Sequence, residues 1–125
     1  MDTNRKHDRL GPVLIRAEFR LDEGGKVHRA YVTNLSRGGT FLATRESIPL
    51  GTRLAIRLSL PWQLGRIDVQ AQAKWHRREH ASPGNSQSPG VGLQFTNLDP
   101  VSIEKIEEYL GKFQALADQL PSPVS

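Results

Sequence analysis

The chain has 125 residues, no cysteine and a formal net charge of +4, with a sequence pI of about 9.9. This length suits one domain, and the absence of cysteine excludes disulfides and thiolate metal sites. No apolar run is long enough to cross a bilayer and no apolar segment follows the N-terminus, so we expect a cytoplasmic protein without membrane insertion. Twelve of the seventeen basic residues are arginines, which favours anionic partners that guanidinium groups bind through paired hydrogen bonds.

Residues 1–12 are polar and charged, and they predict a flexible N-terminal arm. The arm contains Arg5 and Arg9, an arginine pair four residues apart. A guanidinium group offers a planar set of donors to phosphate or to the acceptor edge of guanine, and its flat face stacks on bases. The same spacing recurs inside two predicted strands, at Arg16/Arg20 and Arg53/Arg57. Only the first pair therefore precedes the folded part of the chain.

Six segments predict the strands of a half-buried sheet, by alternation of apolar and polar residues in 13–19, 53–60 and 66–75 and by β-branched and aromatic residues in 27–33. They are residues 13–19, 27–33, 40–43, 53–60, 66–75 and 91–95. In residues 66–75 the alternation places Trp75 on the inward face. Short strands separated by turns predict a small barrel or sandwich, in which residues 66–75 pair antiparallel with both 53–60 and 91–95. Residues 81–89 are rich in Ser, Pro and Gly and predict a mobile hairpin loop.

Asp99 and Pro100 predict the start of a C-terminal helix, with Asp at the N-cap and Pro at the first helical position. Its apolar residues follow one another at intervals of three and four: Ile103, Ile106, Leu110, Phe113, Ala117 and Leu120. This narrow stripe favours a helix packed against the barrel at one of its openings. A helix–helix dimer contact is the alternative, so we expect a monomer or a weak homodimer. Residues 121–125 form a tail.

The turn at residues 34–39 carries the most distinctive chemistry of the chain. It reads Asn34-Leu35-Ser36-Arg37-Gly38-Gly39 and joins two predicted strands. Asn and Ser side chains bond to nearby backbone in tight turns, and glycines permit positive φ and close approach. The turn can simply close a hairpin, or it can offer donors and acceptors to a polar ligand.

No motif of an enzyme is present, because Ser36 lacks the Gly-x-Ser-x-Gly context and no phosphate-binding loop of the Walker or Rossmann type occurs. The histidines are scattered or lie on a strand, which disfavours a metal site. Residues 74–78 combine four basic residues with Trp75, as single-stranded nucleic-acid platforms do. The solvated end of a strand explains them better, so nucleic acid is disfavoured as a partner.

The arginine pair at Arg5 and Arg9, followed by the Asn-x-Ser-x-x-Gly turn, resembles the PilZ domain family, as do the order of strands, the late strand at residues 91–95 and the closing helix. The resemblance implies a six-stranded antiparallel β-barrel with a C-terminal α-helix over residues 13–120, and a non-enzymatic receptor for the bacterial second messenger cyclic di-GMP. It implies no cofactor beyond this ligand. It also implies an unidentified downstream protein, with outputs such as motility or exopolysaccharide synthesis.

The resemblance implies a role for each residue of the two motifs. Arg5 and Arg9 would clamp the ligand, while Asn34 and Ser36 would bond to a guanine and to the phosphate region. The complete implied ligand site is Arg5, Arg9, Asn34, Ser36, Arg37, Gly38 and Gly39. On binding, the arm would fold over the ligand and create a surface for the partner. The alternative is an adaptor that keeps the barrel and binds no nucleotide.

Overall fold

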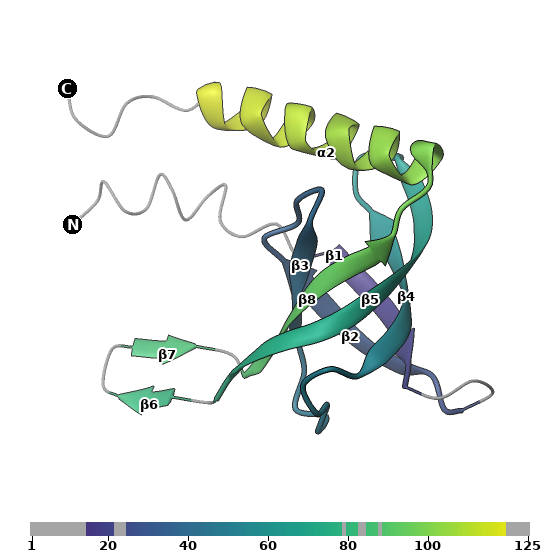
Figure 1. The fold of residues 1–125 in the computed structure, drawn as a ribbon. Coiled ribbons are helices and arrows are strands. Elements are labelled where there is room, and N and C mark those ends of the chain that lie inside the picture. Colours follow the sequence, from purple (N-terminus) through teal and green to yellow (C-terminus); the bar gives the residue numbers. More distant parts are fainter. Residues whose placement is uncertain (1–14, 22–24, 79, 83–84, 88, 120–125) are drawn as a thin grey trace.

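The computed structural model describes residues 15–21, 25–78, 80–82, 85–87 and 89–119. Six antiparallel strands close into a barrel in the order β1-β2-β3-β8-β5-β4 (Figure 1). They are β1 (Ile15–Arg20), β2 (His28–Thr33), β3 (Gly39–Ala43), β4 (Arg53–Leu60), β5 (Gly65–Arg77) and β8 (Gly90–Asn97). The predicted six-stranded barrel with a C-terminal helix is confirmed. The predicted arm, including Arg5 and Arg9, and the predicted tail lie outside the described residues.

Alternating side chains fill the barrel, as the sequence pattern predicts. Along β4 the apolar residues Leu54, Ile56 and Leu58 are buried, while Arg53 and Arg57 are exposed. Strand β5 pairs antiparallel with β4 on one side and with β8 on the other, which confirms both predicted pairings. One face of β4 therefore forms part of the core, and the other is free to carry charge.

The predicted inward orientation of Trp75 is wrong. The side chain of Trp75 is 50% exposed, although Ala73 just before it is buried. The register of β5 with β8 shifts between Ala73 and Trp75. An extra residue in one strand of a pair reverses the faces of the residues that follow it. The irregularity therefore turns the indole to the outer surface.

Residues 81–89, predicted as a loop, contain two short strands instead. Strand β6 (His80–Ser82) pairs antiparallel with β7 (Asn85–Gln87) in a separate two-stranded sheet. Figure 1 shows this hairpin projecting away from the barrel beyond the end of β5. Ladder hydrogen bonds are made by the backbone, so polar side chains do not prevent a short hairpin from pairing.

Helix α2 (Pro100–Asp118) lies across one end of the barrel (Figure 1). Asp99 is its N-cap and accepts a hydrogen bond from the backbone N–H of Ser102 at 2.7 Å, as predicted. Ile106 and Tyr109 belong to the buried core, with Leu110 and Phe113 partly buried against it. Tyr109 was not in the predicted stripe, and burial raises the pKa of its hydroxyl.

The turn between β4 and β5 meets the helix through an aromatic contact. Trp62 and Gln63 both have positive φ, at 59° and 62°. The indole of Trp62 stacks on the ring of Tyr109, with centroids 5.3 Å apart. Left-handed backbone is costly for such residues, and the stacking helps to maintain the turn.

Within the described part of the chain, no helix is long and apolar enough to span a bilayer.

Candidate functional site

The turn between β2 and β3 begins at Asn34, which has a φ of 55°. Asparagine tolerates this left-handed conformation better than most residues with a side chain. The next residue, Leu35, is buried in the core and anchors the turn. The Asn34 side chain is exposed and has no hydrogen-bond partner in the described structure. Its amide is therefore available for a ligand.

Ser36 organises the rest of the turn. Its backbone N–H donates to the carbonyl oxygen of Gly39 at 2.9 Å. Its Oγ accepts from the N–H groups of Gly38 and Gly39 at 3.2 and 3.3 Å, and it donates to the Gly39 carbonyl oxygen at 3.3 Å. A hydroxyl that bonds to its own turn in this way preorganises the loop. Ser36 therefore maintains the conformation of the turn while it remains exposed.

The two glycines of the turn have different functions. At Gly39 an added Cβ would overlap the carbonyl oxygen of Leu93 on β8, whereas at Gly38 the nearest atom would be Ser36 Oγ at 3.9 Å. Neither glycine has a positive φ. Gly39 is thus required for close approach of two strands, and the only positive φ in the turn is that of Asn34.

Arg37 points toward the helix rather than along the turn. Its Nη1 lies 2.9 Å from Oε2 of Glu107 on α2. Both side chains are more than half exposed, so this ion pair adds little stability. It nevertheless joins the turn to the helix directly.

A hollow of about 360 Å³ opens beside the turn. Its lining residues come from the turn and from β3, β5 and β8: Asn34, Ser36, Gly38, Gly39, Thr40, Phe41, Lys74, Trp75, Leu93 and Gln94. The hollow thus combines an amide, a hydroxyl, an ammonium group and an indole face. A flat anionic ligand could use all of them, through hydrogen bonds, charge and stacking.

An aromatic stack supports the wall of this hollow. The indole of Trp75 stacks on the buried ring of Phe41, with centroids 5.5 Å apart. The guanidinium of Arg77 lies 4.0 Å from the centroid of the same Phe41 ring. A Cβ at Gly92, the pairing partner of Trp75, would overlap the indole. Glycine at this position therefore leaves the space that Trp75 occupies.

The structure thus brings part of the predicted site together. Asn34, Ser36, Gly38 and Gly39 all line the hollow, whereas Arg37 pairs with α2 and does not line it. Arg5 and Arg9 lie outside the described residues, so their part of the site stays a prediction.

The ligand site predicted from the sequence did not include Lys74, Trp75 or Gln94, which also line the hollow. The first two belong to a basic and aromatic segment that the sequence does reveal, but the alternation of β5 assigned the indole to the core. Gly92, which lies opposite Trp75, was the available signal that an aromatic ring lies over the outside of the sheet.

These features define a class: a small closed β-barrel with a C-terminal helix and a polar, partly aromatic hollow at one hairpin turn. A model of the PilZ domain family matches residues 3–112. The chain therefore belongs to the PilZ domain family. No curated protein sequence gave a match.

Solved structures show the same fold at low sequence identity. The PilZ domain of YcgR from Escherichia coli, determined with c-di-GMP, is 19% identical, with a TM-score of 0.64 over 86% of this chain and 89% of that one. MrkH from K. pneumonia is 18% identical, with a TM-score of 0.70 over 86% and 48%. The Bacillus subtilis inhibitor of motility, MotI/DgrA, is 16% identical, with a TM-score of 0.57 over 86% and 49%. The chain thus spans about half the length of these last two proteins.

Proposed function

We propose that this chain is a receptor for cyclic di-GMP that performs no chemistry on the ligand and relays its binding to a protein partner. One observation carries the proposal: the Asn-x-Ser-x-x-Gly turn of a PilZ domain borders a hollow that also contains Lys74 and Trp75. Cyclic di-GMP is flat, doubly anionic and rich in guanine acceptors, and these groups complement it. The presence of c-di-GMP in the similar YcgR domain gives further support.

Within this proposal, the turn provides the fixed half of the site. The free amide of Asn34 bonds to a guanine, and the exposed turn at Ser36 faces the phosphate region. Trp75 offers a stacking surface and Lys74 offers charge. Neutral hydrogen bonds of this kind contribute about 0.5–1.5 kcal/mol each, and those to charged groups about 1.5–3 kcal/mol.

Arg5 and Arg9 provide the second half of the proposed site, in the predicted arm. Both fall within the range matched by the family model. Their guanidinium groups clamp the ligand from the side opposite the turn, so that binding orders the arm and forms a new surface. Such a change in surface is the signal that a partner protein recognises.

The proposed output is control of motility or of exopolysaccharide synthesis. The description of MotI/DgrA as an inhibitor of motility supports the first of these. A cytoplasmic location follows from the proposal, because the second messenger is made and read inside the cell.

Isothermal titration with cyclic di-GMP tests the proposal. Arg9→Ala should weaken binding by about thirtyfold to a hundredfold, equivalent to about 2–3 kcal/mol, because a charged bidentate contact is lost. Arg20→Ala is the matched control, since Arg20 belongs to an equally spaced pair but is exposed on β1. It should bind as the unmodified chain does, and chromatography should recover the ligand intact.

Circular dichroism must show that both variants are folded. If the unmodified folded chain does not bind cyclic di-GMP, the proposal is wrong, and the result favours the nucleotide-free adaptor. If Arg20→Ala abolishes binding and Arg9→Ala does not, the proposed clamp is wrong.

A further inference from the structure

The outer face of four neighbouring strands carries a row of residues with no compensating negative charge. Strand pairing places Tyr31 beside Arg16, Arg16 beside Ser59, and Ser59 beside Arg66. We call these four residues, which cross β2, β1, β4 and β5, the arginine row. Neither arginine side chain of this row has an ion pair or hydrogen bond in the described structure.

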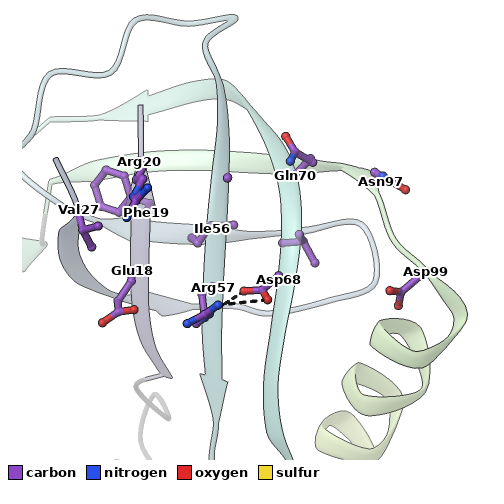
Figure 2. A pocket seen from close by; sticks show the side chains of 12 residues that line it. Glu18, Phe19, Arg20, Val27, Ile56, Arg57, Asp68, Gln70, Asn97 and Asp99 are labelled. Atoms are coloured by element: carbon purple, nitrogen blue, oxygen red, sulfur yellow. Dashed lines mark hydrogen bonds and ion pairs between the residues drawn. The ribbon is translucent and has the colours of Figure 1, made fainter. Parts of the chain in front are cut away.

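The next row along the same face is electrically balanced. It contains Arg29, Glu18, Arg57 and Asp68 in the same strand order, and we call it the ion-pair row. Arg57 Nε lies 2.7 Å from Asp68 Oδ1, and Arg29 Nε lies 3.6 Å from Glu18 Oε2; dashed lines in Figure 2 mark the contact between Arg57 and Asp68. Of these two rows, only the arginine row therefore carries uncompensated charge.

The surface is hollowed on both sides of the ion-pair row. All four residues of the arginine row line a hollow of about 510 Å³. A second hollow, of about 480 Å³, lies beside it and shares Glu18 as a lining residue; Figure 2 shows it with Arg20 and the Arg57–Asp68 pair. A chain segment could thus lie along the face and contact both rows.

We propose that the arginine row binds an acidic segment of a partner protein. Two unpaired guanidinium groups suit carboxylates, which they bind bidentately, and the hydroxyls of Ser59 and the exposed Tyr31 add hydrogen bonds. This proposal specifies the kind of partner in the proposed function, and it rests on the relay of ligand binding to a protein.

Two observations favour a protein segment over nucleic acid. The ion-pair row carries no net charge, and the side chains of Glu18 and Asp68 remain 46% and 68% exposed in it, so a continuous phosphate backbone would find no further positive charge beside the arginine row. A polypeptide can place acidic residues on the arginine row and basic or amide groups on these carboxylates. Moreover, Tyr31 is the one aromatic side chain of the row, whereas single-stranded nucleic-acid platforms stack successive bases on several.

The arginine row and the hollow beside the β2–β3 turn share no lining residue. Ligand and partner can therefore be bound at the same time. Binding to the arginine row is also measurable without cyclic di-GMP, so that failure here is distinguishable from failure of the ligand proposal.

The experiment measures binding of a fluorescein-labelled peptide of alternating Glu and Ser by fluorescence anisotropy at low salt. Arg16→Gln/Arg66→Gln should weaken binding by about tenfold, because two exposed ion pairs are lost. Arg78→Gln/Lys112→Gln removes the same charge from exposed positions elsewhere and should change binding less than twofold. With the unmodified chain labelled with ¹⁵N, peptide-induced amide shifts should map to β1, β4 and β5.

Thermal unfolding should show both double variants as stable as the unmodified chain, since all four side chains are exposed. The proposal is overturned if the two double variants weaken binding equally, because net charge alone then explains it. Shifts confined to β3 and β8 would overturn it as well. Tighter binding of labelled oligouridine than of the peptide, with the same dependence on Arg16 and Arg66, would also overturn the proposal.

Discussion

Asn34 illustrates how one residue can serve the backbone and the ligand at once. Its positive φ turns the chain at the end of β2, so that Leu35 is buried and Ser36 returns to the surface. Asparagine tolerates this conformation, and its amide stays exposed. Asn34 therefore has a conformational function besides the proposed contact to guanine.

The contrast between the two glycines gives a prediction at this scale. Gly39→Ala should destabilise the fold by about 1–3 kcal/mol, because the new Cβ meets the backbone of Leu93, which can move only with β8. Gly38→Ala has open space and should lie within about 0.5 kcal/mol of the unmodified chain. Urea denaturation measures both. An equal loss of unfolding free energy in the two variants would contradict the close approach of Gly39 to the backbone of Leu93.

At the level of elements, alternation predicted the barrel strands well because it reflects burial directly. The bounds of β4 match the predicted residues 53–60. The prediction failed at Trp75, where a register irregularity changes the face of the strand. Such an irregularity arises from pairing with β8, which lies far along the chain, so local alternation does not reveal it.

The candidate site, like the strands, was predictable only where a local sequence pattern defines it. A contiguous motif, the turn with Asn34 and Ser36, was visible in the sequence. Gln94 reaches the hollow through strand pairing, and its sequence neighbours give no sign of it. Likewise, the spacing of the apolar stripe of α2 omitted Tyr109, which is buried in the core and stacks on Trp62.

The N-cap of α2 gives a prediction of pH dependence. Hydrogen bonds from Ser102, through its backbone first and its side chain second, hold the pKa of Asp99 below its ordinary value of 3.8. Because the folded-state pKa is the lower one, this contribution is present above the unfolded-state pKa and is lost as pH falls through the folded-state value. Asp99→Asn keeps an acceptor but does not titrate. The stability difference between the unmodified chain and Asp99→Asn should therefore shrink as pH falls from 6 to 3.

Guanidinium denaturation at several pH values across this range measures that difference. A control is Asp118→Asn at the other end of the helix, which should show no corresponding change because it is not a cap residue. A difference for Asp99→Asn that stays constant with pH would contradict the assigned capping interaction.

Across the whole molecule, helix and barrel share one core. Ile106 is fully buried among barrel residues, while Val101 on the same helix is 58% exposed. The helix therefore uses its apolar stripe within the chain, which favours the barrel-packed arrangement over the helix–helix dimer.

Ile106→Ala should consequently cost about 2–5 kcal/mol of unfolding free energy without changing the association state. Val101→Ala, at an exposed position, should change stability by less than about 0.5 kcal/mol. Chemical denaturation combined with analytical ultracentrifugation tests both. If Ile106→Ala keeps full stability while a dimer dissociates, the helix is an intermolecular contact.

Closure of the barrel also limits how this domain can recognise proteins. Each of the six barrel strands is paired with a neighbour on both sides, so none presents a free edge along its whole length to a strand from a partner. A partner of the barrel therefore binds mainly to outward side chains rather than to backbone. Those positions can change without disturbing the core. Domains of this fold can in this way acquire different partners while the barrel is retained, consistent with similar folds at 19% identity or below in YcgR, MrkH and MotI/DgrA.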